Sequence, residues 1–453
     1  MPRSKRHGGG SFLQFPVFLL LPGLALKRWV ALAALGGVAI ALGIAFSTRV
    51  PVGPGFSSLI GFATLRDATP AIRGGVFVSI GIAILSGGIF MLARSLASVR
   101  RHRTDLGLLD SIYVDRVLGA GPRIVAIGGG TGLATLLRGL KHYTTNITAV
   151  VTVADDGGSS GRLRTELGIP PPGDIRNCLA ALADSEDVMQ QLLDYRFSTN
   201  GYLDGHNLGN MLIAALARIG GGFDKGVEMA AELLAIRGKV IPATPENVTL
   251  VGSTVSGQEL VGESRVGTAP DRLRTVQLLP PQAQAHPDAT KAIWEADLIV
   301  LGPGSLFTSI VPNLLVEEIA EAVSTAKALK MYIVNVAEQP GETDGLSAAN
   351  HLDVVRNYGS DVCVDVVIAN DNCPNLNGSS ALKLVEPDYA WSDKIAYVLA
   401  DVIDEKRPEH HDSMKLASTI AATYRQYRGV SRRLRRVWRQ PEEATSLTTE
   451  VQR

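Results

Sequence analysis

The sequence has few cysteines and no cysteine pair. Among its 453 residues the only cysteines are Cys178, Cys363 and Cys373. An odd number without a CxxC spacing argues against a disulfide framework and against a zinc site. Because free cysteine is among the most often buried residues, we expect three reduced, buried thiols in a cytosolic domain.

The chain also lacks net charge. Lys and Arg total 44, Asp and Glu total 44, and the formal charge at pH 7 is zero. A balanced chain has no overall electrostatic preference for a nucleic acid or for an acidic partner, and we expect no nucleic-acid ligand. The basic residues are nevertheless clustered, in 2–7, 94–103 and 428–439.

Charged residues are absent from two long apolar runs, WVALAALGGVAIALGIAF (29–46) and GGVFVSIGIAILSGGIFMLA (74–93). Each is close to the length of about 20 residues that a helix needs to cross a bilayer. Lys and Arg gather before the first run and after the second, and such residues accumulate on the cytoplasmic side. The pattern predicts a multi-pass hairpin in the cell membrane, with both termini and the soluble domain in the cytoplasm.

Alternatives to this hairpin are a signal peptide and a buried pair of soluble helices. No convincing small-residue cleavage site is present, and a second apolar run follows the first. The apolar but proline-interrupted residues 12–26 are interpreted as an interfacial or re-entrant segment. The predicted divisions are 1–26 (basic and interfacial), 27–103 (hairpin), 104–121 (linker), 122–428 (ligand-binding domain) and 429–453 (basic amphipathic helix and tail).

After the hairpin, short apolar runs alternate with longer helical patterns. The runs are 123–128, 147–154, 296–302, 330–337 and 362–370. Continuous apolar strands separated by helices predict an α/β fold, a Rossmann-like and mostly parallel sheet with helices on both faces. Residues 239–280 break this rhythm with short alternating strands, which predict a small β insertion.

Four glycines crowd the junction between the first predicted strand and its helix, in VAIGGGTGLATLLRGL (125–140). The first amides of a helix are unpaired and its dipole is positive there, which favours an anion, usually a phosphate. Glycine allows close approach and angles that a Cβ would forbid. The spacing is neither GxGxxG nor a P-loop. The alternatives are a tight structural turn or a phosphate-facing turn, with candidate residues Gly129, Gly130, Thr131 and Gly132.

A second turn of this kind occurs in IVLGPGSLFTSIVPNLL (299–315), where a strand precedes a predicted helix start. A role for Ser305 as a helix N-cap is compatible with phosphate binding. Two anion-competent turns suit a diphosphate better than one does. The candidate residues of the second turn are Gly302, Gly304, Ser305, Thr308 and Ser309.

Acidic residues follow the second predicted strand, in VTVADDGGSSGRL (151–163). An acid at this place contacts a ribose in dinucleotide folds. The adjacent carboxylates of Asp155 and Asp156 could instead hold Mg²⁺, with Asp156 as the candidate metal ligand. The third alternative is an Asx-turn without a ligand.

Two further segments add polar candidates. PPPGDIRN (170–177) is expected to project Asp174, Arg176 and Asn177 from a rigid loop, and DGHNLGN (204–210) brings His206 and Asn207 to a helix start. We select Asp174, Asn177, His206 and Asn207 as ligand-binding candidates. His206 has an equally simple explanation as a hydrogen-bonded structural residue.

Taken together, these segments resemble the CofD/YvcK superfamily, and most closely its YvcK branch of gluconeogenesis factors. The resemblance runs from about 123 to 420 and rests on GGGTGLATLLRGLK, TVADDGGSSGRLRTELGIPPPGDIRNCLAALAD, GHNLGNMLIAAL, GPGSLFTSIVPNLL and QPGETDGLSAANH. It implies binding of a UDP-sugar such as UDP-N-acetylglucosamine and regulation of carbon-source-dependent cell-envelope growth and cell shape. In the CofD branch it implies instead Mg²⁺-dependent transfer of 2-phospho-L-lactate in deazaflavin coenzyme biosynthesis, the alternative function.

The chain departs from the family pattern at three places. Phe307 stands where many relatives have Tyr, Ala337-Glu338 differs from the usual Met-Thr, and His410-His411-Asp412 replaces Arg-His-Asp. Typical members lack the hairpin. Whether the chain is an enzyme stays open, a homodimer is compatible with the family, and the glycine spacing disfavours an NAD(P) oxidoreductase.

A basic segment ends the chain. In VSRRLRRVW (430–438), Val430, Leu434, Val437 and Trp438 share one helical face and the arginines occupy the other. Such a helix is expected to lie on an anionic cytoplasmic leaflet. Nucleic-acid binding and a solvated tail are the alternatives.

Overall fold

The structure is a computed structural model that describes residues 26–47, 69–97, 117–184, 186–360, 362–372, 383–388 and 395–427. Its contacts separate two compact units, Met1–Val117 and Leu118–Arg453. The predicted basic tail, nearly all of the predicted interfacial segment and most of the predicted linker lie outside the described residues.

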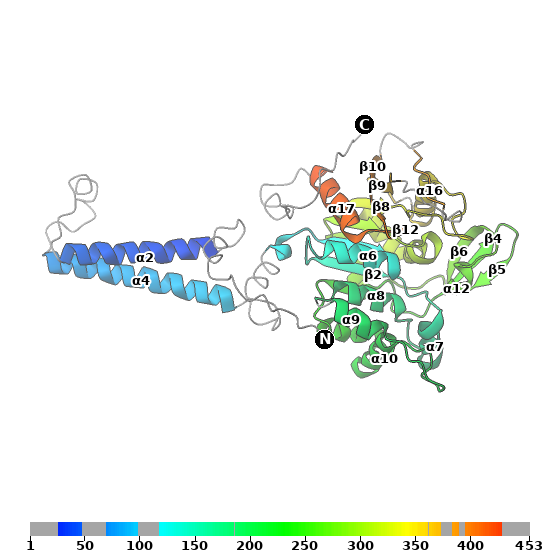
Figure 1. Ribbon diagram of the computed structural model, residues 1–453, viewed down its shortest axis with the longest axis horizontal. Helices are drawn as coiled ribbons and strands as arrows, with labels where there is room; N and C mark the ends of the chain where they lie inside the picture. The colour runs from blue at the N-terminus through cyan, green and yellow to red at the C-terminus, as the bar shows by residue number, and fades with distance from the viewer. Residues whose placement is uncertain are drawn as a thin grey trace, which may run out of the picture. The chain divides into compact units, whose positions relative to one another are not determined.

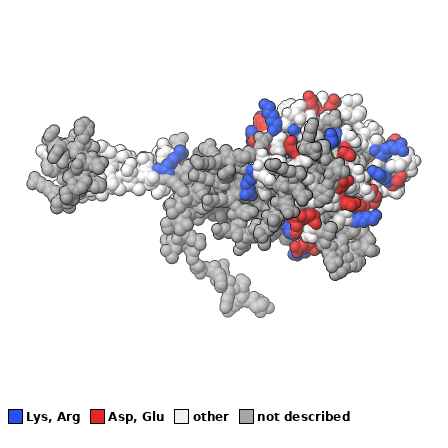
Figure 2. Space-filling view, turned by 90° about the horizontal axis from the view of Figure 1, so that it is seen from above, with Lys and Arg blue, Asp and Glu red and all other residues white. Residues whose placement is uncertain are grey.

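The N-terminal unit contains two helices in contact, α2 (Leu26–Ser47) and α4 (Pro70–Ala97) (Figure 1). Both are long and apolar enough to span a bilayer, in Arg28–Ala45 and Gly74–Met91, and only 11% and 17% of these windows are buried. Figure 2 shows the described surface of the pair as uncharged apart from a basic patch at one end. Because a helix pair inside a soluble core would be mostly buried, this exposure favours the membrane hairpin over the buried alternative.

Glycines at intervals of seven residues form the contact between the two helices. α2 contributes Gly36 and Gly43, and α4 contributes Gly74, Gly81 and Gly88. A Cβ on Gly36 would lie 2.6 Å from the backbone nitrogen of Leu85, and one on Gly81 would lie 2.8 Å from that of Ile40. Small residues that let two backbones approach are typical of helix pairs in membranes. The sequence analysis missed this regular spacing.

We expect Gly36→Leu to separate the two helices and Gly37→Leu to leave them in place. The next residue along the chain, Gly37, has no atom within 4 Å of its added Cβ. A leucine at Gly36 meets backbone, which cannot yield, so the helix axes should move apart by about 2 Å. Electron–electron resonance between spin labels at Leu35 and Ser86, in vesicles and in a cysteine-free background, measures the change. Equal distances in both variants would contradict this packing.

The second unit is built on a seven-stranded sheet. In spatial order its strands are β10 (Ala396–Ala400), β9 (Val366–Asn370), β8 (Leu329–Ile333), β7 (Leu298–Leu301), β1 (Ile124–Gly128), β2 (Ile147–Val151) and β3 (Lys239–Pro242). All six neighbouring pairs are parallel. Numbered along the chain, the order is 3-2-1-4-5-6-7, the dinucleotide-fold order with one further strand.

Helices connect these strands. They are α6 (Thr131–Leu140), α7 (Gly158–Leu167), α8 (Gly173–Leu182), α9 (Glu186–Asp194), α10 (Leu208–Gly220), α11 (Phe223–Leu233), α12 (Glu263–Val266), α13 (Pro287–Glu295), α14 (Val311–Leu314), α15 (Glu317–Thr325), α16 (Ala348–Tyr358) and α17 (Ser413–Tyr427). Parallel crossovers are right-handed. From β1 the chain moves to β2 at one side of the sheet, and from β7 it moves to β8 at the other side. The helices after β1 and β2 therefore cover one face. The helices after β7 and β8 cover the other.

The strands read as continuous apolar runs because both faces of the sheet are covered. All five residues of β1 are buried, and so are all four of β7. The five strands expected from the sequence are confirmed in this sheet. Cys178 is buried as expected, whereas Cys363 is exposed, which corrects that part of the expectation. Cys373 lies outside the described residues.

The predicted β insertion is smaller than 239–280. Its first residues form β3, the edge strand of the main sheet, because Val240 and Ile241 are buried beside β2. A separate antiparallel sheet contains β5 (Glu259–Val261), β4 (Thr249–Thr254) and β6 (Leu273–Leu279). The sequence analysis did not predict β10 or the hairpin of β11 (Ile403–Asp404) and β12 (Arg407–His411).

Candidate functional site

The two glycine turns lie side by side because β1 and β7 are neighbours in the sheet. A Cβ on Gly132 would lie 2.5 Å from the carbonyl oxygen of Pro303 and 2.8 Å from the Cα of Gly304. The structure therefore brings both predicted turns together. One of the two reasons given for the glycines of the first turn, unusual backbone angles, is wrong: none of them has a positive φ, and they are needed for close approach alone. In the second turn Gly302 and Gly304 do have positive φ, 84° and 153°.

Carboxylates of the protein itself bind amides in both turns. The Glu342 carboxylate accepts hydrogen bonds from the backbone nitrogens of Phe307, at 2.6 Å, and Thr308, at 3.1 Å. Asp174 accepts one from the backbone of Gly130. Glu342 is only 2% exposed and Thr308 only 4%. The amides of Phe307 and Thr308 therefore already have a partner within the protein, and a contact of Thr308 with a ligand stays a prediction.

A loop after β8 holds the second turn in place. The Ser305 hydroxyl accepts a hydrogen bond from Gln339 Nε2 at 2.7 Å, and the Gly304 nitrogen donates to Asn335 Oδ1 at 3.4 Å. Ser305 makes no helix-capping bond. The hydroxyl of Ser305 consequently has a protein partner but still lies at the surface of the turn.

The predicted helix start after Ser305 is wrong in detail. A π-helical turn, η2 (Leu306–Ile310), comes first and is followed by the single turn α14. Asn313 explains the wider turn, because its Nδ2 donates to the carbonyl oxygens of Gly128, at 3.1 Å, and Ser309, at 2.7 Å. Ser309 in turn packs on Gly129, whose added Cβ would collide with the Ser309 hydroxyl.

Between the turns and the loop lies an open crevice of about 240 Å³. Its lining residues are Thr131, Gly132, Thr135, Pro303, Gly304, Ser305, Asn335, Val336, Ala337, Glu338, Gln339, Glu409, His410 and His411. They come from the start of α6, the ends of β7 and β8, and β12. This is the switch point of the strand order, where open α/β sheets bind their ligands.

Asp155 and Asp156 follow the end of β2, as predicted. Asp155 Oδ1 accepts from the Gly157 nitrogen at 2.8 Å, which is an Asx-turn. Asp156 Oδ1 accepts from the Ser264 nitrogen of α12 at 2.9 Å. The Asx-turn considered for this segment is therefore present, and a contact of either residue with a ligand stays a prediction.

Several carboxyl groups near the turns are poorly solvated and close to one another. Burial, followed by the charges of Asp155 and Glu263, raises the pKa of Asp174 to about 8. Burial and the charges of Asp155 and Asp156 raise the pKa of Glu263 to about 7. Burial also raises the pKa of Glu342 to about 7. A phosphate near this group therefore requires that some of the carboxyls are protonated, or that a cation accompanies it.

The acidic residues do not form a complete metal site. Within the described part of the chain, no group of three or more His, Cys, Asp or Glu side chains is arranged to hold a metal ion. The candidate ligand Asp156 is bonded to Ser264. Mg²⁺ takes one or two carboxylates and completes its shell with water and phosphate oxygens, so this pair alone does not fit a resident ion.

Asp174, Arg176 and Asn177 lie in the first turns of α8 and not on a loop, which corrects that expectation. Arg176 Nη2 donates to Asn177 Oδ1 at 2.7 Å. An added Cβ on Gly130 would lie 2.8 Å from Asn177 Nδ2. Asp174 and Asn177 thus pack directly against Gly130 of the first glycine turn.

His206 and Asn207 lie outside the crevice lining. The Nδ1 atom of His206 is 3.3 Å from the Ser159 hydroxyl. Asn207 caps α10, where its Oδ1 accepts from the Asn210 nitrogen at 3.1 Å. The two residues are 5% and 1% exposed. The geometry favours the structural alternative considered for His206.

Sequence reasoning did not select four residues of this region as ligand candidates: Glu263, Gln339, Glu342 and His411. It named His411 only in a departure from the family pattern. Gln339 and Glu342 belong to QPGET, a segment used above only as a family resemblance. Proline and glycine in such a segment indicate a shaped loop, and the polar residues between them were the available signal. Glu263 had no signal, because the insertion that carries it packs on the site only in three dimensions.

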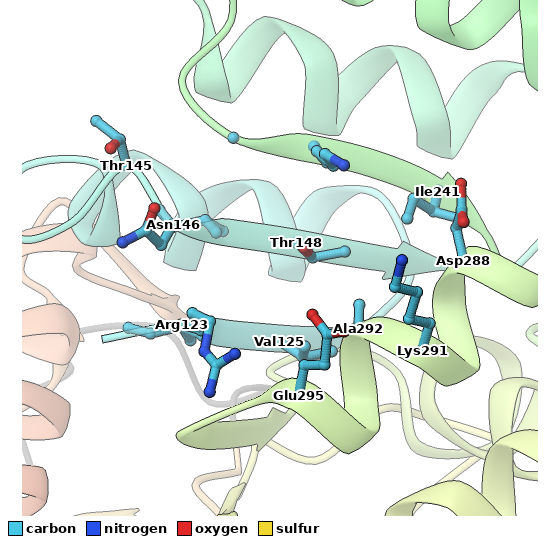
Figure 3. Close-up of a pocket in the computed structure, with 14 residues that line it drawn as sticks. Arg123, Val125, Thr145, Asn146, Thr148, Ile241, Asp288, Lys291, Ala292 and Glu295 are labelled. Carbon is cyan, nitrogen blue, oxygen red and sulfur yellow. The ribbon is translucent and has the colours of Figure 1, made fainter. Parts of the chain in front are cut away.

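A second cavity, of about 400 Å³, lies beside the amino-terminal parts of β1 and β2. Figure 3 shows Arg123, Asn146 and Thr148 from the strand side, with Asp288 and Lys291 from α13. None of the predicted ligand-binding residues lines it. Because ligands of open α/β sheets bind at the carboxyl ends of the strands, the crevice at β1 and β7 is the candidate functional site.

Fold and crevice together define a doubly wound α/β protein with an open crevice at the switch point of its strand order. Residues 124–403 match the family described as 2-phospho-L-lactate transferase CofD. The chain belongs to the CofD family, among the homologues of gluconeogenesis factors.

Several relatives show this similarity. The gluconeogenesis factor of Bacillus subtilis is 49% identical over 253 residues, 56% of this chain and 80% of that protein. A crystal structure of a UPF0052 family member from Bacillus halodurans is 40% identical, with a TM-score of 0.62, and the match covers 66% of this chain and 98% of that one. Both matches leave a large part of this chain uncovered.

Some relatives are longer. The "Putative gluconeogenesis factor" of Nostoc sp. is 40% identical over 419 residues, 89% of this chain and 92% of that protein. The part of this chain that the match leaves out is shorter than residues 1–69, which precede α4. The match must therefore include α4. This relative therefore extends into the hairpin region, whereas the Bacillus halodurans structure, matched over 98% of its length by 66% of this chain, does not.

Proposed function

We propose that this chain is a membrane-tethered regulator of carbon-source-dependent cell-envelope growth and cell shape. It binds a UDP-sugar of the UDP-N-acetylglucosamine type in the crevice at the carboxyl ends of β1, β7 and β8. The observation that carries the proposal is the close contact of Gly132 with Pro303 and Gly304 at the switch point, with the crevice directly beside it.

The crevice supports a ligand with an anionic part and a neutral part. Thr131 and Gly132 form the first turn of α6, where helix amides and the helix dipole favour a phosphate. The rest of the lining includes the polar side chains of Ser305, Asn335 and Gln339 beside the apolar Pro303, Val336 and Ala337. A nucleotide-linked sugar carries both kinds of group, and the lining of the crevice runs from the start of α6 to β12.

The tether rests on α2 and α4. Their glycine contact and outward apolar side chains suit a lipid environment, and the distribution of Lys and Arg around them predicts that the C-terminal unit is cytoplasmic. In this arrangement the ligand-binding unit meets its UDP-sugar at the inner surface of the membrane, where envelope precursors are assembled.

Isothermal titration of the full-length protein in detergent with UDP-N-acetylglucosamine tests the proposed ligand. We expect saturable binding at micromolar to millimolar concentration, roughly 4 to 8 kcal/mol of binding free energy. UDP alone should bind more weakly, because it lacks the sugar. Absence of heat at millimolar UDP-N-acetylglucosamine would remove the proposal.

A transferase is the second candidate function, because the matching family is described by that activity. Transfer of a phosphate-containing group depends mainly on positioning and charge neutralisation, and Asp155 and Asp156 lie near the first turn. These two carboxylates have backbone partners and form no complete metal site. An assay with a guanylated lactate donor, a deazaflavin acceptor and Mg²⁺ separates the candidates, since the regulator yields no product.

A further inference from the structure

One histidine of the crevice has a fixed orientation and a free nitrogen. His411 ends β12, lines the crevice and is 8% exposed. Its Nε2 lies 3.1 Å from the carbonyl oxygen of Val334, the residue after β8. Because a carbonyl oxygen can only accept, the ring proton is on Nε2 and the neutral ring has a lone pair on Nδ1.

The lone pair on Nδ1 has no hydrogen-bond partner among the described residues. The Nε2 atom of His351 also has no partner, but it is completely buried. Nδ1 of His411 is not buried in this way, and the open space that His411 lines is the crevice. The ring thus presents one directed acceptor to whatever fills the crevice.

The charge of the ring and of its surroundings limits what the acceptor can bind. Burial lowers the pKa of His411 to about 4, so the ring is neutral at physiological pH. The described lining contains no Lys or Arg at this end and does contain Glu338 and Glu409. A phosphate would be repelled here, whereas an uncharged group with a hydroxyl or N–H donor would be accepted.

We propose that His411 Nδ1 accepts a hydrogen bond from an uncharged donor of the ligand, a sugar hydroxyl or a ring N–H. It therefore selects the neutral part of the ligand, while the start of α6 faces the phosphates. This inference rests on the proposed UDP-sugar site and adds to it the orientation of the ligand, with the neutral part at β12.

Two substitutions at His411 separate ligand binding from a merely structural role. In His411→Gln the amide nitrogen can replace Nε2 and keep the bond to Val334, but the acceptor at the Nδ1 position is lost. In His411→Asn the amide oxygen lies near the former Nδ1 position, and the bond to Val334 is lost. His286→Gln, at the start of α13 and outside the crevice lining, is the matched control.

We measure affinity by calorimetry with UDP-N-acetylglucosamine and stability by thermal unfolding of the full-length protein. Affinity and stability should rank the two His411 variants in opposite orders. We expect His411→Gln to bind roughly three- to tenfold more weakly with little loss of stability. His411→Asn should unfold at a lower temperature and bind more tightly than His411→Gln, and His286→Gln should bind like the wild type.

The outcomes are distinguishable. Wild-type affinity in His411→Gln, with weak binding only in the unstable His411→Asn, would show that His411 acts through Val334 alone and would overturn the inference while leaving the UDP-sugar site intact. Absence of binding to the wild-type protein would remove the inference together with the proposed function.

Discussion

Replacement of Gly132 by alanine is expected to weaken UDP-N-acetylglucosamine binding about 100-fold while the protein still folds. The added Cβ would lie 2.5 Å from the carbonyl oxygen of Pro303 and 2.8 Å from the Cα of Gly304. Both neighbours are backbone atoms, so the start of α6 must move away from the second turn. A displacement of this kind changes the crevice that both turns share.

The same substitution should cost stability as well. Forcing one methyl group into a packed contact typically costs about 1–3 kcal/mol, which leaves a stable domain folded. Gly201→Ala is the matched control, because an added Cβ there has no atom within 4 Å. Calorimetry measures affinity and urea unfolding measures stability. If Gly132→Ala matched Gly201→Ala in both, the two turns would not be in contact in solution.

The sheet could be predicted from the sequence because its strands are buried on both faces. Runs such as 123–128 and 296–302 are apolar throughout, and this pattern has few explanations other than a parallel strand. β10 was missed because the half-exposed AYVLA gives a weaker signal. β3 was assigned to the wrong sheet because strand pairing depends on distant partners and not on local pattern.

The site could be predicted only in outline. Glycines at a strand end indicate close approach, and this placed each turn correctly at the end of its strand. The sequence could not show that Glu342, some 35 positions after the second turn, supplies the acceptor oxygen for the amides of Phe307 and Thr308. A folded chain can satisfy an anion-binding turn with its own carboxylate, and local sequence does not reveal the choice.

Glu342 also makes the stability of the fold depend on pH. Burial raises its pKa to about 7 from the ordinary 4.5. A carboxyl whose pKa is raised on folding binds its proton more tightly in the folded state, so its stabilisation is complete below pH 4.5 and is lost as pH rises to about 7. For this 2% exposed side chain the loss is about 3 kcal/mol. Glu263 and Asp174 change stability in the same direction.

Glu342→Gln should flatten this dependence. The glutamine oxygen can accept from the amides of Phe307 and Thr308 but carries no titrating proton, so the variant should gain stability relative to the wild type as pH rises from 4.5 to 8. Glu342→Ala leaves both amides without a partner and should lose about 2–4 kcal/mol at every pH. Urea unfolding of the full-length protein in detergent, followed by tryptophan fluorescence, measures both.

Glu321→Gln, on the exposed side of α15, removes a carboxyl of the same type away from the turns and serves as control. Its pH profile should parallel the wild type. A profile of Glu342→Gln that also paralleled the wild type would mean that Glu342 is ionised throughout and that its two amide bonds outweigh burial. In that case the second turn would carry a permanent negative charge, and only the amides at the start of α6 would remain for a ligand phosphate.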